Sequence, residues 1–322
     1  MHAIVYHRYG TPDVLEFADV ERPAPGAGEV LIRVRAASVN PYDWHFLRGT
    51  PRLVRLLTGI GRPKLPRLGA DVSGIVEAVG EGTTHFRPGD AVFGVCKGAF
   101  AEFACGRESQ VALKPNGISF EQAASLPIAG ITALQGLRDC GCLREDQSIY
   151  GASGGVGTFA VQIALVMGAW VTGVCSTRNV QMVGELGAHR VLDYTRHEFG
   201  RGGYRYDVVF DLVGNRPLAD FRQVLKRHGI YVACGGGGPD NCGLHLLAQM
   251  VGRMLLNPWV PQKLTGLHAK VHTSDLLTLA AMVEEGKISP VLDRRYPLPS
   301  TAEAIRYVEQ CHARGKVTIA VA

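Results

Sequence analysis

Apolar and polar residues alternate along much of the first 118 residues. From Val30 to Ala36 an apolar or small residue stands at nearly every second position, and glycines interrupt an apolar segment from 69 to 80. Turn signals such as Pro88-Gly89-Asp90 separate these segments. Because a two-residue period is typical of half-buried strands, the pattern predicts short strands and tight turns, which suggest an open β-barrel.

The pattern changes at Ser119. Ser119 and Gln122 have the spacing of a helix capping box, and an apolar-periodic run follows to Leu137. Strand-like and helix-like segments then alternate up to about residue 272. The predicted strands cover 147–151, 170–175, 190–193, 206–211 and 229–234, and the predicted helices cover 156–167, a segment ending near 186 and a segment ending at 226. This alternation is typical of right-handed βαβ crossovers and predicts a doubly wound parallel sheet.

The last part of the chain returns to the earlier style. Residues 238–262 are apolar and irregular, a pattern that fits a lid or a subunit contact. A helix is predicted over 275–286, Ser300 and Glu303 predict the cap of a last helix, and 316–321 alternates as a closing strand. We therefore expect the C-terminus to rejoin the first domain. The predicted organisation is 1–122 for the first part of one domain, 123–272 for an inserted dinucleotide-binding domain, and 273–322 for the return.

Composition supports a folded protein of about two domains. The chain has 322 residues, of which 46% are hydrophobic and 20% are charged, and its net charge of +5 is spread along the chain. Nucleic acid is therefore not an expected partner. Its eight cysteines form no Cys-x-x-Cys pair, and no apolar stretch approaches the roughly 18 residues that span a bilayer. We expect a cytoplasmic protein of a reducing compartment, without a membrane partner.

A glycine-rich segment carries the strongest chemical signal. Four glycines stand within Gly151–Gly157, between a predicted strand and a predicted helix. Glycines there let backbone N–H groups approach a pyrophosphate at the positive end of a helix. The segment matches A-x-G-x-x-G at Ala152, Gly154 and Gly157, which predicts cofactor contacts along this turn.

The end of the next predicted strand favours NADPH over NADH. An NAD-type site places Asp or Glu there to hold the ribose hydroxyls, whereas this chain reads Cys-Ser-Thr-Arg-Asn over 175–179, and no acid is in reach along that stretch. The hydroxyl of Ser176 and the guanidinium of Arg178 suit a dianionic 2′-phosphate. Tyr194, after the following strand, is a candidate for the same site or a half-buried packing residue.

Five motifs along the chain resemble those of the medium-chain dehydrogenase/reductase superfamily, in its zinc-free quinone oxidoreductase-like branch. They are Val39-Asn40-Pro41-Tyr42-Asp43-Trp44, Leu68-Gly69-Ala70-Asp71-Val72-Ser73-Gly74, Arg87-Pro88-Gly89-Asp90-Ala91-Val92-Phe93-Gly94, the turn at 151–157 and His312-Ala313-Arg314-Gly315-Lys316-Val317. The first and last look most like the reticulon-interacting oxidoreductases. The resemblance implies an α/β fold with a GroES-like barrel and a Rossmann domain. It also implies diphosphate contacts at Ser153, Gly155 and Val156, and cofactor contacts at His312, Ala313 and Arg314. The glycine run that begins with Gly235 and Gly236 follows a predicted strand and is expected to pass the nicotinamide.

The resemblance also bears on metals. Zinc-dependent members of the superfamily hold the catalytic metal with a Cys at the position of Asn40 and with a Gly-His-Glu at the position of Gly69-Ala70-Asp71. Because tetrahedral zinc sites combine Cys, His and carboxylate donors, we expect no catalytic metal in this chain.

Without a Lewis acid, hydride transfer from NADPH favours quinones and α,β-unsaturated carbonyl compounds, in which the arriving charge is delocalised onto an oxygen. The candidate catalytic residues are Asn40 as an amide donor, Tyr42 and His45 as proton donors, and Asp43 as a residue that orients them. Asn40 is equally a turn residue, Asp43 equally an N-cap, and Trp44 more often core than a substrate platform. The alternatives are an alcohol dehydrogenase or aldehyde reductase, and a non-catalytic, crystallin-like NADPH-binding protein. A homodimer is the usual arrangement of the family.

Overall fold

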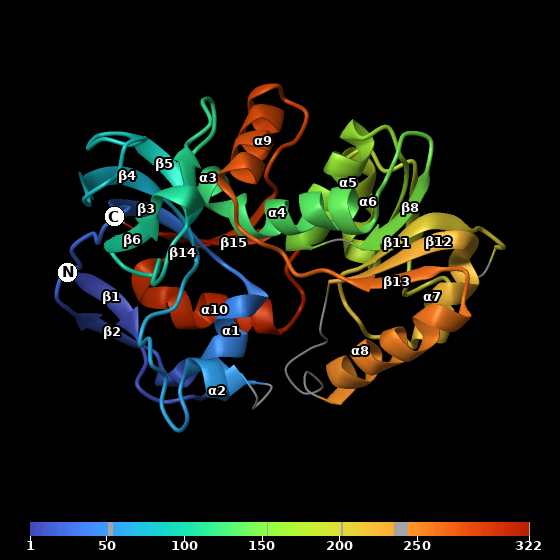
Figure 1. Cartoon of the computed structure of the whole chain (residues 1–322), viewed down its shortest axis with the longest axis horizontal. Helices are drawn as coiled ribbons and strands as arrows, with labels where there is room; N and C mark the ends of the chain where they lie inside the picture. Colours follow the sequence, from blue (N-terminus) through green and yellow to red (C-terminus); the bar gives the residue numbers. More distant parts are fainter. Residues whose placement is uncertain (51–53, 153, 201, 235–243, 322) are drawn as a thin grey trace. The chain divides into compact units, whose positions relative to one another are not determined.

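The computed structural model describes residues 1–50, 54–152, 154–200, 202–234 and 244–321. The chain divides into two compact units (Figure 1). The first unit comprises Met1–Ile131 and Lys270–Ala322, and the second comprises Thr132–Ala269. The domain boundaries that we expect at residues 122 and 272 stay a prediction.

Within its described residues, the first unit contains a seven-stranded sheet. The strand order is β14-β15-β3-β4-β5-β7, and β6 pairs with β3 beside this path. The strands are β3 (Glu29–Val39), β4 (Asp71–Val79), β5 (Ala91–Val95), β6 (Phe103–Arg107), β7 (Val111–Leu113), β14 (Leu292–Pro297) and β15 (Lys316–Ala320), and a separate antiparallel pair is formed by β1 (His2–Val5) and β2 (Glu16–Asp19). Antiparallel pairing of β15 with β3 brings the C-terminal strand back to the sheet begun near the N-terminus.

Short helices accompany this sheet. They are α1 (Pro41–Arg48), α2 (Val54–Thr58), α3 (Phe120–Ser125), α9 (Thr273–Glu284) and α10 (Thr301–Glu309), and α4 (Pro127–Gln135) runs from the first unit into the second. The capping box of Ser119 and Gln122 is confirmed. The apolar-periodic run to Leu137 is divided among three helical segments, because Pro127 starts a new helix and α4 gives way to a π-helix (Gly136–Cys140). Ser300 stands at the N-cap of α10 but makes no capping bond through its side chain, so the predicted cap with Glu303 is wrong.

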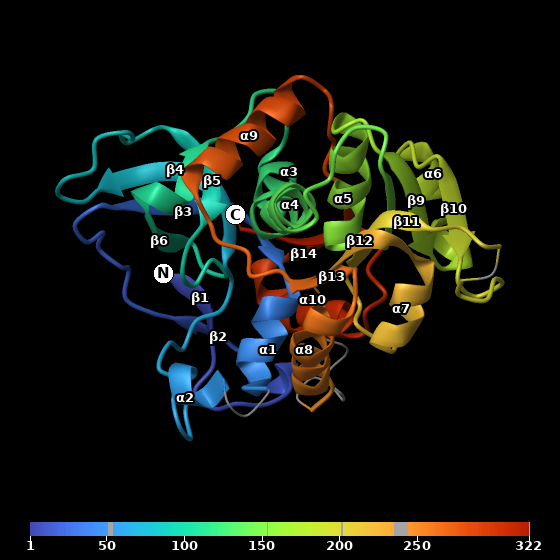
Figure 2. The ribbon, with the colours of Figure 1, turned by 45° about the vertical axis from the view of Figure 1, so that its right-hand side comes forward.

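The second unit has a six-stranded parallel sheet in the part of the chain that is described. Its order is β10-β9-β8-β11-β12-β13. The strands are β8 (Ser148–Ala152), β9 (Trp170–Cys175), β10 (Arg190–Asp193), β11 (Tyr206–Asp211), β12 (Leu225–Ala233) and β13 (Lys263–Gly266), and the helices are α5 (Gly155–Val166), α6 (Val180–Glu185), α7 (Leu218–Val224) and α8 (Leu244–Leu256). Successive crossovers run outward from β8 in one direction and from β11 in the other. Right-handed connections therefore place α5 and α6 on one face and α7 and α8 on the other, as Figure 2 shows. The predicted doubly wound sheet is confirmed.

Two predictions in this unit need correction. The segment 238–262 is not irregular throughout, because α8 occupies most of its described part and a 3-10 turn (Asn257–Trp259) follows. The predicted helix ending at 226 stops at Val224, because Leu225 already pairs with Tyr206 at the start of β12. The register of this pairing shifts between Tyr206 and Val208, and the local apolar pattern does not reveal the early pairing of Leu225.

Candidate functional site

The glycine-rich turn of the second unit has the geometry of an anion-binding helix start. Gly154 has φ +102° and ψ −171°, a backbone conformation that is essentially restricted to glycine. It is the N-cap of α5, and as a glycine it has no side chain that could cap this helix. Gly154 therefore leaves the first N–H groups of α5 to other acceptors, and this helix start fits a diphosphate. The predicted contact Ser153 lies outside the described residues.

The same turn stands where the order of the strands reverses. β8 lies between β9 and β11, and the chain moves outward from this pair in opposite directions. In open α/β sheets, ligands bind beyond the carboxyl ends of the strands at such a reversal. The turn that follows β8 thus lies at the place where a dinucleotide would bind within this unit.

The residues predicted to face a 2′-phosphate follow β9 and β10. The backbone N–H of Tyr194 donates to the carbonyl of Cys175 at 3.0 Å. The loops that start with Ser176 and Tyr194 therefore leave the sheet side by side. Arg178 is exposed in a 3-10 turn (Thr177–Asn179). Tyr194 is 58% exposed and is not the half-buried packing tyrosine that the sequence left as an alternative. The structure brings these three side chains to adjacent strand ends, and their contact with a cofactor stays a prediction.

The expectation that no acid lies near this loop is wrong in three dimensions. Parallel pairing sets Asp193, the last residue of β10, opposite Cys175. The Asp193 carboxylate accepts a hydrogen bond from Thr177 Oγ1 at 2.5 Å. Thr177 and Asp193 are sixteen residues apart in the sequence, so the local sequence around 175–179 gives no sign of this acid.

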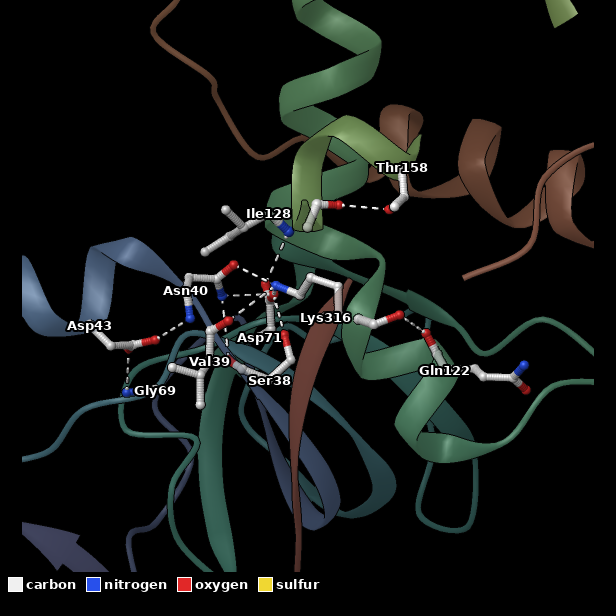
Figure 3. Close-up of polar contacts among 12 residues, drawn as sticks. Ser38, Val39, Asn40, Asp43, Gly69, Asp71, Gln122, Ile128, Thr158 and Lys316 are labelled. Carbon is white, nitrogen blue, oxygen red and sulfur yellow. Dashed lines mark hydrogen bonds and ion pairs between the residues drawn. The ribbon is translucent and has the colours of Figure 1, made fainter. Parts of the chain in front are cut away.

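In the first unit, a buried polar cluster lies at the end of β3 (Figure 3). We define it as Ser38, Asn40, Asp71 and Lys316. The Lys316 ammonium donates to Asn40 Oδ1 at 2.6 Å and lies 3.3 Å from Asp71 Oδ2. That same carboxylate oxygen accepts from Ser38 Oγ at 2.7 Å and from Asn40 Nδ2 at 2.9 Å. All four residues are at most 3% exposed. A single buried ion pair with its hydrogen bonds thus joins β3, β4 and β15.

This cluster does not suit a zinc ion. Its donors are one carboxylate, one amide and one hydroxyl, whereas protein zinc sites are built from thiolate and imidazole together with carboxylate. The Lys316 ammonium already contacts the Asn40 and Asp71 oxygens. Over the ranges that the structure describes, no group of three or more His, Cys, Asp and Glu could hold a metal ion.

Asn40 and Asp43 frame the start of α1. Asn40 is the N-cap, and its backbone N–H donates to Asp43 Oδ2 at 2.8 Å. Asp43 is therefore the third helical residue and not an N-cap. Its other oxygen accepts from the backbone N–H of Gly69 at 3.1 Å. Burial raises the pKa of Asp43 to about 7, with the nearby Asp71 adding to the rise, while the two N–H donors and Lys316 oppose it.

The Asn40 amide faces the interior. Its Nδ2 donates to Asp71 and, at 3.4 Å, to the carbonyl of Ser38. These bonds use the N–H groups that a substrate oxygen would need, so the contacts favour the structural alternative for Asn40.

Tyr42 and His45 occupy different surroundings on α1. Tyr42 is 46% exposed and packs on Phe46, with the ring centroids 4.1 Å apart. Burial of part of the side chain raises the pKa of Tyr42, so its hydroxyl keeps its proton at neutral pH. His45 stacks on Trp44, which is 2% exposed and is confirmed as a core residue. Its Nδ1 lies 3.2 Å from the carbonyl of Thr50, and burial lowers the pKa of His45.

The remaining predicted residues belong to loops. His312, Ala313 and Arg314 lie between α10 and β15, where the backbone N–H of Arg314 donates to Asp293 Oδ2 at 2.9 Å. Gly235 and Gly236 lie outside the described residues.

Sequence reasoning missed Lys316 as a functional element, although the residue stands in a quoted motif. A signal was present, because Lys316 opens the otherwise apolar strand β15, whose next residue pairs with Val39. A lysine at such a place predicts a buried anion nearby.

Comparisons with known proteins extend over the whole chain. A family model described as alcohol dehydrogenase GroES-like domain matches residues 26–116, and one described as zinc-binding dehydrogenase matches residues 186–319. The chain is 32% identical to a chloroplast envelope quinone oxidoreductase homolog of Arabidopsis thaliana, covering 99% of this chain and 98% of that relative. It is 32% identical to the mitochondrial NAD(P)H oxidoreductase RTN4IP1 of Mus musculus, covering 100% and 89%.

A solved structure of a quinone oxidoreductase is also similar to this chain. The chain is similar, with a TM-score of 0.83 and 25% identity, to Escherichia coli quinone oxidoreductase complexed with NADPH, and each chain is covered to 100%. The predicted combination of a GroES-like domain with a Rossmann-type sheet is thereby confirmed.

Proposed function

This chain belongs to the medium-chain dehydrogenase/reductase superfamily, and we propose that it is a zinc-independent oxidoreductase that transfers hydride from NADPH to quinones or α,β-unsaturated carbonyl compounds. The proposal rests on one observation above the others. A guanidinium and a hydroxyl, from Arg178 and Ser176, follow the strand next to a glycine-rich helix start. That is the combination that a 2′-phosphorylated dinucleotide requires.

The chain's residues divide the work of holding the cofactor. The N–H groups at the start of α5 would receive the diphosphate, and Ser176, Arg178 and Tyr194 would receive the 2′-phosphate and its adenosine. NADPH, when bound, supplies the hydride. NADH has no 2′-phosphate for these residues to contact, so the protein should bind NADH more weakly than NADPH.

Metal-free chemistry restricts the substrate class. A substrate must accept hydride without strong polarisation of its carbonyl, and in quinones and enones the incoming charge spreads to an oxygen. Tyr42 presents an exposed, protonated hydroxyl that can donate to this oxygen. Asn40 and Asp43 act through the start of α1, because their capping box sets the position of Tyr42 on the helix.

Replacing Arg178 by Ala tests the cofactor assignment. We expect the Kd for NADPH to rise at least tenfold and the Kd for NADH to change by less than twofold, because only NADPH loses a bidentate phosphate partner. Arg144→Ala, in a loop before β8, is the matched control and should leave both constants unchanged. Equal weakening of the two cofactors in Arg178→Ala would count against the assignment.

Turnover assays test the reaction. NADPH oxidation should proceed with phenanthrenequinone or a simple enone, with and without a chelator. Activity restricted to aldehydes and lost with chelator would support an alcohol dehydrogenase or aldehyde reductase instead. Cofactor binding without turnover of any of these compounds would support a non-catalytic, crystallin-like protein.

We also infer a cytoplasmic homodimer. β13 is the last strand at one edge of the six-stranded sheet. Among the described residues no further strand pairs with its outer edge, which could therefore pair with a second copy. Across the described ranges, no helix is long and apolar enough to cross a membrane. Light scattering checks the mass, and fractionation of cells checks the location.

A further inference from the structure

A buried acid stands among the residues proposed to receive the 2′-phosphate. Asp193 is 5% exposed at the end of β10, opposite Cys175 on β9. The loop that follows Cys175 carries Ser176 and Arg178, with Thr177 between them. An ionised carboxylate can accept hydrogen bonds from hydroxyl groups, and it repels a phosphate dianion. Its presence is at odds with a preference for NADPH unless the carboxylate is engaged elsewhere.

Two threonines engage it. Thr177 Oγ1 donates to Asp193 Oδ2 at 2.5 Å, and Thr195 Oγ1 donates to Asp193 Oδ1 at 2.7 Å. The backbone N–H of Thr195 adds a third bond at 2.9 Å, and Arg196 Nε lies 3.6 Å from Oδ2. Desolvation on its own would raise the pKa of Asp193, but the donors from Thr177 and Thr195 hold it below its usual value. The acid is therefore ionised at neutral pH with both oxygens occupied.

The same bonds fix the loop. Thr177 belongs to the loop after β9, whereas Asp193 and Thr195 belong to the end of β10 and its following turn. The hydroxyls of Thr177 and Thr195 lie 2.8 Å apart, and both contact the Asp193 carboxylate. These three groups connect the end of β9 with the end of β10. Movement of the carboxylate toward a ribose would break the contacts that hold Thr177, and with it the neighbours Ser176 and Arg178.

We propose that Thr177 and Thr195 determine cofactor specificity by holding the Asp193 carboxylate away from the ribose, so that the loop receives a 2′-phosphate. The proposal deepens the assignment of NADPH and rests on it. Thr177 and Thr195 are positioning residues, since they act through Asp193. Removal of both hydroxyls takes two of the three hydrogen bonds from the carboxylate and leaves only the backbone N–H of residue 195 and the nearby Arg196. The loosened carboxylate would repel NADPH and offer an acceptor to the ribose of NADH.

The decisive experiment compares three variants with the wild-type protein by isothermal titration with NADPH and with NADH. In Thr177→Val/Thr195→Val we expect the Kd for NADPH to rise about tenfold, while the Kd for NADH stays equal or falls. Adding Asp193→Asn to this pair should return the Kd for NADPH to within about threefold of wild type, because the repelling charge is gone. Thr177→Ser/Thr195→Ser keeps both hydroxyls and should bind both cofactors like wild type.

The outcomes separate this inference from the proposed function. If the double Val variant weakens both cofactors alike, or if Asp193→Asn gives no recovery, the threonines have only a structural role and the inference is overturned. A wild-type protein that does not prefer NADPH would overturn the proposed function, and the inference with it. Should the double variant fail to fold, Thr195→Val alone removes one bond to the carboxylate, and the same shift toward NADH is expected at about threefold.

Discussion

Replacing Lys316 by Met tests whether the buried polar cluster holds the first unit together. Met has a similar length and an apolar end, so the change removes the ammonium with little change in volume. The Asp71 carboxylate, at 0% exposure, then loses the cation that lies 3.3 Å from its Oδ2. Removing one partner of a buried pair typically costs 3–5 kcal/mol of unfolding free energy, because the other charge stays buried and unpaired.

The contacts of Asp71 place the expected loss near the lower end of that range. Three donors would remain after the change, namely Ser38 Oγ at 2.7 Å, Asn40 Nδ2 at 2.9 Å and the backbone N–H of Ile128 at 3.0 Å. Hydrogen bonds to an ionised group each contribute roughly 1.5–3 kcal/mol, and because these three persist in the variant, the carboxylate is not left without partners. We expect the unfolding free energy to fall by about 3 kcal/mol.

Guanidinium unfolding followed by circular dichroism measures this loss. Lys287→Met is the matched control, because Lys287 pairs with Glu285 at an exposed position and should lose less than about 1 kcal/mol. The double variant Lys316→Met/Asp71→Asn removes both charges and should recover part of the stability. If Lys316→Met is no less stable than Lys287→Met, or the double variant is the less stable of the two Lys316 variants, our account of the cluster is wrong.

Three further predictions concern other features of the molecule. Asp43→Asn should flatten the dependence of stability on pH: since burial raises the folded-state pKa of Asp43 above its unfolded value, the stability it contributes is fully present below about pH 4 and is lost as pH rises to about 7. Between pH 5 and pH 7.5, the unfolding free energy measured with urea should fall less for Asp43→Asn than for wild type. Equal falls in the two proteins would contradict the raised pKa of Asp43. Gly154→Ala should raise the Kd for NADPH at least tenfold, because Ala is strained at φ +102°, whereas Gly184→Ala, whose added methyl group meets nothing within 4 Å, should leave it unchanged in the same titration. Prolonged chelation should leave quinone reduction intact, because the cluster at Asn40 and Asp71 does not suit zinc, and a loss of activity restored by zinc would refute this reasoning.

Most of the second unit could be predicted from the sequence, because its signals are local. The strands 170–175, 190–193 and 206–211 agree with β9, β10 and β11, since apolar runs of that length are bounded by turns or helices. The errors lie where distant contacts decide. Leu225 joins a strand rather than a helix because Tyr206 pairs with it, and no local pattern records that pairing.

In the candidate site too, local spacing predicts some residues, and distant contacts decide others. Ser119 with Gln122, and Gly154 before α5, depend on neighbours three or fewer residues away, so their roles can be read from spacing. The exposure of Tyr194 and the inward direction of the Asn40 amide depend on which strands pair. Sequence patterns alone therefore left alternatives open at these positions.

On its own, the amino-acid sequence determined the alternation of strands and helices, the glycine turn and the pairing of a hydroxyl with a guanidinium after the second strand. These features follow from steric and hydrogen-bonding preferences that act over a few residues. Only the tertiary structure decided that Lys316 would meet Asp71, and Asp193 would meet Thr177. The two residues of each pair come from different strands or strand ends, and strand register is what brings them within hydrogen-bonding distance in a buried, low-dielectric setting.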